Sequence, residues 1–385
     1  MTCRVVLITE IIAPYRVPVF NALARQPGID LHVIFLAETD PTQRQWLVPK
    51  ADIQFAYEIL PSWRRRIYGR NILLNWGMGE ILQHISADVI VCGGYNYFAS
   101  WEALRWARRN DKPFLLWVES TAQDSRSGSV LVENLKLKFI RQCDGFVVPG
   151  KSSFEYLRSY DLAEDRVFPA PNAVDNTFFS QAAWVARQTA SVHREAFQLP
   201  GRYFLFVGRL EPEKGIFDLL DAYLALPGQV QRDLGLVFVG DGSARSHLKR
   251  QVEAANSDLI RIIGFLQREQ LAILYGLADI FVFPTHTDPW GLVVNEAMAC
   301  GLPVICSKAA GCAADLVDDA NGRLVGTADV AQLLAALNEL ASNPKMRLSM
   351  SQQSLRKIQQ YSPEACAAGI ANAVLANAEV RPEYV

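Results

Sequence analysis

Residues 208–215 are the first candidate for chemistry: they read Gly-Arg-Leu-Glu-Pro-Glu-Lys-Gly and follow a hydrophobic run that we expect to be a strand. The strand ends at Gly208, and the loop behind it carries Arg209 and Lys214. Arginine offers a planar fork of N–H donors, lysine offers a mobile ammonium, and the first amides of a following helix add further donors. These groups together suit phosphate oxygens. Taken alone, the segment also fits a surface loop with solvated charges.

Residues 288–304 are the second candidate, and they read Asp-Pro-Trp-Gly-Leu-Val-Val-Asn-Glu-Ala-Met-Ala-Cys-Gly-Leu-Pro-Val. A loop with Asp288 and Gly291 leads into a predicted helix that carries a second acid, Glu296. A carboxylate can accept hydrogen bonds from two hydroxyls, as in the binding of ribose or sugar diols. The amides of Gly291, Leu292 and Val293 can meet a phosphate at the helix start. The alternatives are a helix-face charge at Glu296 and a capping acid at Asp288.

The two segments in combination resemble glycosyltransferase family 4, whose members are retaining, nucleotide-sugar-dependent enzymes of the GT-B fold. The resemblance covers most of residues 200–330. It also includes these shorter matches: Gly240-Asp241-Gly242, Ile263-Gly264-Phe265, Ala278-Asp279, Pro284, Asn321-Gly322 and, before them, Pro171-Asn172 with Asp175 and Phe178.

This resemblance implies roles for single residues. Arg209 and Lys214 match the pair that neutralises the diphosphate as the glycosidic bond breaks, which is electrostatic stabilisation of a leaving group. Glu296 matches the ribose-binding carboxylate. Asp288 stands where the family usually has Glu in contact with donor-sugar hydroxyls, and its shorter side chain puts that reach in question. Backbone groups around Gly264, Phe265 and Leu266 match the base-binding end of a strand.

The same resemblance bears on cofactors and on the donor. An Asp-x-Asp motif, the usual metal-diphosphate clamp of the other large transferase fold, does not occur in the chain. Because two cations at the diphosphate make a metal unnecessary, we expect no metal and no cofactor, with a nucleotide-diphosphate sugar as co-substrate. Uridine diphosphate sugars are favoured because they are the commonest donors in the family, and guanosine diphosphate mannose stays open.

The first half of the chain departs from the family pattern. In place of a Gly-Gly turn after the first strand it has a segment with Tyr15 and Arg16, which we expect at the carboxyl end of that strand and facing the cleft. Arg16 is placed to touch phosphate or acceptor, with a surface cation as the alternative. Asn172, from the Pro171-Asn172 match, is assigned to the same acceptor side.

Many relatives also have a histidine after the equivalent of the fourth strand, where this chain has Glu119, with Asp124 and Arg126 beyond it. A carboxylate at the end of a strand can orient or deprotonate an acceptor hydroxyl. The alternative is a structural carboxylate paired with Arg126. In a front-face retaining reaction the leaving phosphate itself can take the proton, so no protein base is required.

The order of the elements gives the fold class. Predicted strands at residues 5–9, 31–36, 89–92, 114–118, 146–148 and 167–168, and again at 203–207, 236–239, 259–263, 280–283, 304–306 and 322–325, alternate with helical patterns. These helical patterns include residues 17–25, 72–84, 102–109, 152–159, 216–225 and 293–300. Alternation of this kind is typical of α/β proteins with parallel sheets that bind ligands at the carboxyl ends of their strands.

We therefore expect the α/β GT-B architecture, in which two Rossmann-like, doubly wound domains face each other across a cleft. Residues 1–176 form the acceptor-binding domain and residues 177–361 the donor-binding domain. The boundary follows the proline-rich segment 169–175, after which comes a polar stretch that ends near residue 201. The Ala-rich tail at 362–385 either closes the second domain or crosses back to the first.

Composition excludes several classes of protein. The chain has 385 residues, 50% of them hydrophobic, a formal net charge of −2 and a pI near 6.3, which argues against a generally basic nucleic-acid binder. No run of about 18 apolar residues is free of charges and breakers, so no transmembrane helix is expected. The first residues predict a strand rather than a signal peptide. The seven scattered cysteines predict buried or half-buried thiols rather than disulfides or a zinc site.

One local feature points to a lipid. The segment 62–70, Ser-Trp-Arg-Arg-Arg-Ile-Tyr-Gly-Arg, holds four arginines, and a second cluster combines Trp101 and Trp106 with Arg105, Arg108 and Arg109. Such mixtures suit an anionic membrane surface or a polyprenyl-diphosphate acceptor. The alternative is a solvated helix face or an ordinary loop. We expect a cytoplasmic protein that is open to peripheral contact with the inner face of a membrane.

The leading hypothesis is a retaining glycosyltransferase that moves a hexosyl group from a nucleotide-diphosphate sugar to a hydroxyl of a glycan or lipid-linked glycan in polysaccharide or glycoconjugate biosynthesis. A nucleotide-sugar epimerase on the same fold and a non-catalytic two-lobed binding protein are the alternatives. The loop with Arg209 and Lys214 disfavours the epimerase. A dehydrogenase is weaker, because the Gly-x-Gly at 240–242 lacks a third glycine.

Overall fold

A computed structural model describes residues 2–40, 45–67, 70–121 and 130–378. The chain forms two compact units, and each is described by itself. Unit 1 consists of residues 1–173 and 363–385, and unit 2 of residues 174–362. The sequence placed the corresponding boundaries after residues 176 and 361.

Unit 1 is built on a parallel sheet in the strand order β3-β2-β1-β6-β7-β8-β9. Its strands are β1 (Cys3–Thr9), β2 (Ile29–Phe35), β3 (Ala56–Ile59), β6 (Val89–Cys92), β7 (Phe114–Trp117), β8 (Gly145–Val148) and β9 (Val167–Pro169). The central strands are apolar along their length because both faces of the sheet are covered. The strand order reverses at β1, where the chain runs to β2 on one side and later to β6 on the other.

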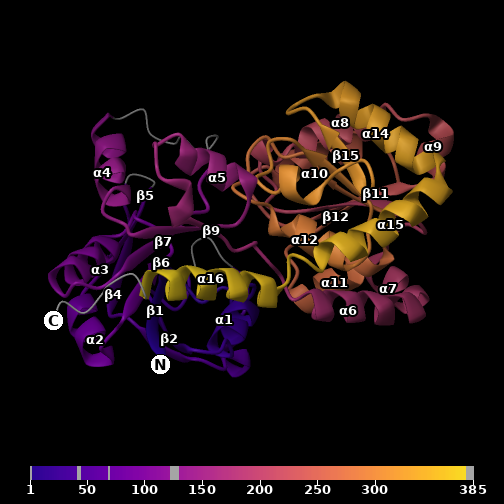
Figure 1. The fold of residues 1–385 in the computed structure, drawn as a ribbon. Helices are drawn as coiled ribbons and strands as arrows, with labels where there is room; N and C mark the ends of the chain where they lie inside the picture. Colours follow the sequence, from indigo (N-terminus) through magenta and orange to yellow (C-terminus); the bar gives the residue numbers. More distant parts are fainter. Residues whose placement is uncertain (1, 41–44, 68–69, 122–129, 379–385) are drawn as a thin grey trace. The chain divides into compact units, whose positions relative to one another are not determined.

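The helices of unit 1 cover both faces of this sheet (Figure 1). They are α1 (Val17–Ala24), η1 (Lys50–Asp52), α2 (Met78–Ile85), α3 (Phe98–Arg109), α4 (Val130–Ile140), α5 (Lys151–Arg158), η3 (Glu164–Arg166) and α16 (Pro363–Ala378). Helices α1 and α16 share one core, and α2 to α5 share the other. Of the two placements that the sequence left open for the tail, the structure has the second, because α16 packs on α1, β8 and β9.

A hairpin outside the main sheet is the largest departure from the predicted elements. Strands β4 (Ser62–Ile67) and β5 (Arg70–Asn75) pair antiparallel. The sequence predicted one helical segment from residue 72 to 84, but its first part belongs to β5 and only the part from residue 78 is helical. The alternative that the sequence kept for the arginine segment, a helix face or an ordinary loop, does not hold for residues 62–67, which form β4. Alternation explains the hairpin: Arg64 and Leu73 turn inward, while Trp63 and Leu74 are exposed.

The inward-facing arginine of this hairpin is neutralised locally. Arg64 forms ion pairs with Asp40 and, at 3.2 Å, with Glu10. The exposed Arg65 lies over the ring of Trp63. The structure describes the side chains of two arginines in this segment, and of these Arg65 faces solvent and Arg64 does not.

Unit 2 repeats the architecture with a sheet in the order β12-β11-β10-β13-β14-β15. Its strands are β10 (Tyr203–Val207), β11 (Gly235–Val239), β12 (Ile260–Ile263), β13 (Ile280–Phe283), β14 (Val304–Ser307) and β15 (Gly322–Val325). All are parallel and match the predicted segments to within one residue at each end. The strand order reverses between β10 and β13, and in such sheets ligands bind outside the carboxyl ends of the strands at that point.

The helices of unit 2 enclose a single core. They are α6 (Asn176–Gln188), α7 (Ala190–Phe197), η4 (Pro212–Lys214), α8 (Ile216–Leu224), α9 (Gly228–Asp233), α10 (Arg245–Ala254), α11 (Arg268–Leu277), α12 (Leu292–Ala299), α13 (Ala313–Leu316), α14 (Val330–Ser342) and α15 (Pro344–Ile358). The polar stretch after the predicted boundary is helical. Asp175 caps α6 by accepting a hydrogen bond from the Phe178 amide, and α6 packs on α11.

Two sequence expectations concern the whole chain. All seven cysteines are free thiols, six of them buried and Cys3 partly buried, as predicted. Within the described ranges, none of the helices has both the length and the apolar character needed to cross a membrane.

Candidate functional site

The loops after β10 and β11 lie so close together that glycine is required between them. A Cβ on Gly240 would lie 1.9 Å from the carbonyl oxygen of Gly208, and one on Gly242 would lie 2.4 Å from that of Leu210. The Leu210 amide also donates to the Asp241 carbonyl, at 2.9 Å. The start of the predicted phosphate loop is thus fixed by backbone contacts beside the switch point of the sheet.

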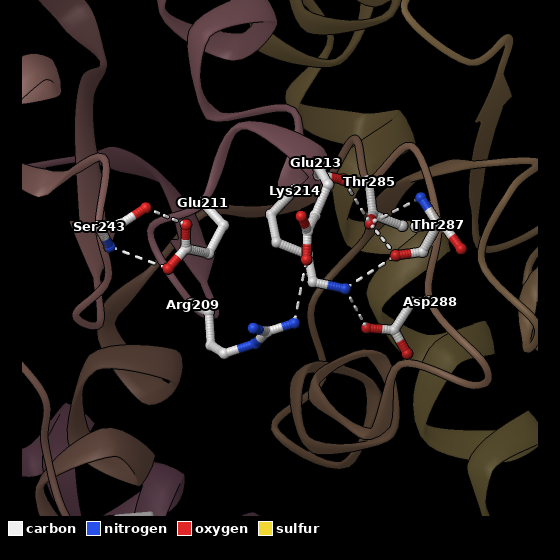
Figure 2. Close-up of polar contacts among 8 residues, drawn as sticks. All are labelled: Arg209, Glu211, Glu213, Lys214, Ser243, Thr285, Thr287 and Asp288. Atoms are coloured by element: carbon white, nitrogen blue, oxygen red, sulfur yellow. Dashed lines mark hydrogen bonds and ion pairs between the residues drawn. The ribbon is translucent and has the colours of Figure 1, made fainter. Parts of the chain in front are cut away.

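The turn η4, which carries Lys214, packs along the segment that follows β13. Gly215 has a φ of +68°, and a Cβ there would lie 2.1 Å from the Pro284 carbonyl oxygen, so only glycine fits. The carbonyl of Glu213 accepts a hydrogen bond from the His286 amide at 2.8 Å. It also lies 3.2 Å from the Thr285 hydroxyl, whose single proton has the Thr287 carbonyl as its nearer acceptor. Figure 2 shows the turn and the segment side by side.

Lys214 and Asp288 were singled out separately in the sequence, and this packing brings them together. The Lys214 ammonium donates to Asp288 Oδ2 at 2.9 Å and to the Thr287 carbonyl at 2.8 Å (Figure 2). The Thr285 hydroxyl holds the same carbonyl from the other side, at 2.8 Å. Lys214 is only 7% exposed, and burying an ammonium requires such partners.

Arg209 lies on the same loop but in a different environment. Its side chain is 58% exposed, and its guanidinium Nη2 lies 3.1 Å from Glu213 Oε1. An ion pair between two exposed side chains contributes little to stability. The Arg209 side chain is therefore free to exchange Glu213 for an anionic ligand at small cost.

A second carboxylate on this loop has its own partner, which the sequence did not indicate. Glu211 accepts hydrogen bonds from the amide and from the hydroxyl of Ser243 (Figure 2). Burial works to raise the pKa of Glu211, but these hydrogen bonds outweigh it and lower the pKa below its usual value. The contact ties the Arg209 loop to the loop after β11.

Helix α12 begins at the same edge of the sheet. Its cap, Gly291, has a φ of +95°, and a Cβ there would lie 2.8 Å from the ring of Phe283, so glycine is required. Leu292 and Val293 follow as the first helical residues. Because the first amides of a helix have no partner within it, these N–H groups are available to a ligand oxygen.

Glu296 is half-buried on α12 and accepts a hydrogen bond from the Tyr275 hydroxyl at 2.8 Å. Burial raises the pKa of Glu296 to about 7, against the opposing effect of the Tyr275 hydrogen bond. Near neutral pH the ionised carboxylate can therefore accept a hydrogen bond from a hydroxyl, and the protonated carboxyl can donate one to a hydroxyl. Tyr275 lies on α11, and no sequence signal linked it to the site.

The predicted base-binding segment follows β12, at the edge of the sheet. Phe265 is exposed and Leu266 partly buried. The amide of Gly240 donates to the carbonyls of Ile263 and Gly264 at 3.1 and 3.3 Å. The segment is thus joined through the loop after β11 to the loop that carries Arg209.

In unit 1 the structure joins three of the predicted residues. The Arg16 guanidinium forms an ion pair with Glu119 Oε1 and donates to Asn172 Oδ1 at 3.3 Å. The same oxygen of Glu119 accepts a second hydrogen bond from Asn172 Nδ2, at 2.8 Å. Both of these contacts are made by Oε1, and no described residue forms a hydrogen bond with Glu119 Oε2. The Glu119 side chain is 42% exposed.

The Arg16 side chain is enclosed. Its guanidinium lies 4.1 Å from the ring centroid of Trp117 and 5.6 Å from that of Tyr15, which itself packs edge-on against Trp46. Burial disfavours the charge, but the neighbouring Glu119 carboxylate more than offsets this effect and raises the pKa of Arg16. Arg16 is therefore not the surface cation that the sequence left as an alternative.

Two predicted residues, Asp124 and Arg126, lie outside the described residues. Within the described residues, the ion-pair partner of Glu119 is Arg16, a pairing that the sequence did not suggest. Among the residues that the structure describes, no group of three or more His, Cys, Asp or Glu side chains is placed to hold a metal ion.

Two family models match the chain. "Glycosyl transferases group 1" matches residues 189–357, and "Glycosyltransferase Family 4" matches residues 19–178. Between them they cover most of both units.

Curated relatives match over part of their length. The chain is 29% identical over 224 residues to O-antigen chain mannosyltransferase B of Escherichia coli, covering 58% of each protein. It is 32% identical over 223 residues to D-inositol 3-phosphate glycosyltransferase of Saccharomonospora viridis, covering 54% of this chain and 49% of that one. The chain thus spans about half the length of the curated relatives it matches.

Solved structures share the whole fold. Anabaena HepE in complex with UDP and glucose has a TM-score of 0.74 at 16% identity, covering 97% of this chain and all of that one. A glycosyltransferase from Rickettsia africae has a TM-score of 0.76 at 14% identity, covering 99% and all, respectively. With both family models matched and the paired parallel sheets in place, the chain belongs to the family 4 glycosyltransferases with the GT-B fold.

Proposed function

We propose that this protein transfers a hexosyl group, with retention, from a nucleotide-diphosphate sugar to a hydroxyl of a glycan or lipid-linked glycan. One observation carries the proposal: Lys214, Arg209 and the start of α12 gather at the switch point of unit 2, with the Glu296 carboxyl on the same helix. Cations and helix amides suit a diphosphate, and a half-buried carboxyl suits a ribose diol.

The chemistry asked of unit 2 is stabilisation of a leaving group. As the glycosidic bond breaks, negative charge grows on the diphosphate, and fixed donors aimed at that charge lower the barrier. Lys214 is held in place by its two acceptors, while Arg209 is free to reorient. Because two cations neutralise the diphosphate, we propose that the reaction needs no metal.

The part asked of unit 1 is to bind the acceptor. One oxygen of Glu119 is held by Arg16 and Asn172, which leaves the other to accept a hydrogen bond from an acceptor hydroxyl. In a front-face reaction the leaving phosphate takes the proton, so Glu119 orients the hydroxyl rather than deprotonating it.

Uridine diphosphate sugars are the donors that we favour. Anabaena HepE has been solved with UDP and with UDP-glucose, and it shares the fold of this chain. A mannosyltransferase among the curated relatives keeps guanosine diphosphate mannose as the second donor to test.

The experiment is a thermal-shift titration of the full chain with uridine and guanosine diphosphates, with and without EDTA. A ligand that binds only the folded state raises the free energy of unfolding, by about 2.7 kcal/mol at a ligand concentration of one hundred times its dissociation constant. The melting temperature rises as a result. We expect a shift with one nucleotide that EDTA leaves unchanged. A shift abolished by EDTA would refute metal independence, and no shift with either nucleotide would refute the donor class.

The lipid-linked acceptor and the place of action are part of the same proposal. Trp63, Arg65 and Leu74 lie on the outward face of the β4–β5 hairpin, and a face that combines rings with a cation suits an anionic membrane surface. We propose a cytoplasmic enzyme with peripheral contact at this face. Flotation with vesicles of neutral and of anionic lipid tests it, and failure to float with anionic lipid would overturn it.

A further inference from the structure

The Asp288 carboxylate is occupied on both oxygens by its own surroundings. Oδ2 accepts from the Lys214 ammonium at 2.9 Å, and Oδ1 accepts from the Trp290 amide at 3.1 Å. The second contact is a local turn, of the kind that Asp side chains form with an amide two residues later. The side chain is only 22% exposed.

The backbone of Asp288 is fixed as well. Its carbonyl accepts from the Gly311 amide at 2.9 Å, and it forms a parallel bridge with Ala310. A Cβ on Gly311 would lie 1.8 Å from the Pro289 carbonyl oxygen, so the two segments are in direct backbone contact. A side chain with a single methylene on such a backbone has little freedom to reach away from Lys214.

Lys214 has donor capacity to spare. An ammonium carries three N–H groups, and among the described residues Lys214 Nζ meets two acceptors, Asp288 Oδ2 and the Thr287 carbonyl. The third N–H is left for a ligand oxygen. The buried ammonium depends on its carboxylate partner, because removing one member of a buried ion pair leaves the other uncompensated.

We propose that Asp288 is a positioning residue that holds the Lys214 ammonium for the diphosphate, and not a ligand of the donor sugar. The proposal rests on the proposed function, because it assigns Lys214 to the diphosphate. It concerns a position where the resembling family usually has a longer acid. The methylene that this chain lacks is the reach that a contact with the sugar would need.

The two roles differ in which part of the donor they affect. Asp288→Asn keeps a carbonyl for the Trp290 amide and removes the charge that faces Lys214. We would measure, by calorimetry on the full chain, the dissociation constants of uridine, UDP and UDP-glucose, with the guanosine series in parallel. A positioning role predicts that D288N weakens UDP about tenfold or more, leaves uridine unchanged, and keeps the ratio of UDP-glucose to UDP affinity.

The opposite pattern would overturn the proposal: D288N binds UDP like the wild type and loses only the extra affinity for UDP-glucose. A double-mutant cycle sharpens the result, because D288N should cost nothing further once Lys214→Ala is present. Asp288→Glu retains the charge and should recover most of the UDP affinity that D288N loses. Failure to recover it would count against positioning by charge.

Asp221→Asn is the matched control, since Asp221 is exposed on α8 of the same unit. It should bind every ligand like the wild type. Failure of the proposed function has a different signature: the wild type itself would bind neither UDP nor GDP. Wild-type binding with an unaffected D288N would overturn the positioning role alone.

Discussion

Both units place a carboxylate against a buried cation at the carboxyl ends of a parallel sheet, but they offer opposite charges to a ligand. In unit 1 the cation, Arg16, is enclosed by Trp117 and Asn172, and the exposed member is the Glu119 carboxylate. In unit 2 the carboxylate of Asp288 is committed on both oxygens, and the exposed charge belongs to Arg209. Unit 1 thus presents a carboxylate to a ligand hydroxyl, whereas unit 2 presents a cation to a ligand phosphate.

The largest expected effect falls on Lys214. Lys214→Ala removes a fixed donor from the developing charge of the diphosphate, so transfer should fall by about 10²–10³-fold. Donor turnover and UDP affinity measure the effect, and a melting curve checks that the protein remains folded. Arg209→Ala should also lower transfer. Wild-type turnover by both variants would remove the basis for treating unit 2 as the phosphate-binding side.

The next effect is on stability. Arg16→Met leaves Glu119 without its cation, and breaking a buried ion pair costs about 3–5 kcal/mol. Since Glu119 is 42% exposed, solvent screening lowers the expected loss to about 2 kcal/mol. Urea unfolding followed by tryptophan fluorescence measures it. Arg25→Met, at an exposed position just after α1, is the matched control and should change the free energy of unfolding little.

A smaller effect, on acceptor binding, distinguishes the role of unit 1 from that of unit 2. Glu119→Gln keeps an oxygen for Arg16 and Asn172 but removes the negative charge that an acceptor hydroxyl would meet. We expect the acceptor KM to rise about tenfold, with UDP affinity and donor hydrolysis unchanged. A change in UDP affinity instead would mean that Glu119 acts on the donor, and the contrast between the units would not hold.

The smallest effect is on pH dependence. Burial raises the pKa of Glu296 from 4.5 to about 7, so between these values the folded state holds a proton that the unfolded state has lost. The contribution to stability is present below pH 4.5 and is lost as the pH rises through 7, over a range of about 1–3 kcal/mol. Glu296→Gln should flatten this slope of unfolding free energy against pH.

Binding supplies the second readout for Glu296. If ribose hydroxyls donate to the ionised carboxylate, UDP affinity should rise severalfold between about pH 6 and 8 in the wild type. The Glu296→Gln variant should lack this rise. A wild-type affinity that falls over the same range would contradict the ribose role.

The sequence predicted most of unit 2 correctly because its signals are local. Strands such as β10 and β13 are short apolar runs, and Arg209 and Lys214 lie in one loop. The Asp288 contact needed tertiary structure, because it depends on how the segment after β13 packs on turn η4. Tyr275 could not be linked to Glu296 for the same reason.

Unit 1 was predicted less completely. Arg16 and Glu119 are 103 residues apart and come from the ends of β1 and β7, which are separated by β6 in the sheet. The β4–β5 hairpin was missed because Leu74 lies four residues before Met78, so the apolar pattern of the real helix α2 continues back into β5 at helical spacing. In β4 the inward-facing position is occupied by Arg64 rather than by an apolar residue, so the alternation of the strand is not visible as a hydrophobic pattern.

The course of the last helix has a consequence for how the chain is made. Helix α16 contributes Cys366, Ile370 and Val374 to the core beneath β1 and β2, so unit 2 is in effect an insertion within unit 1. During synthesis unit 2 is complete before the ribosome has delivered the segment that finishes unit 1. Domains generally fold as units during synthesis. Here the first unit to begin is the last to close, and its apolar face stays open until residue 374 has emerged.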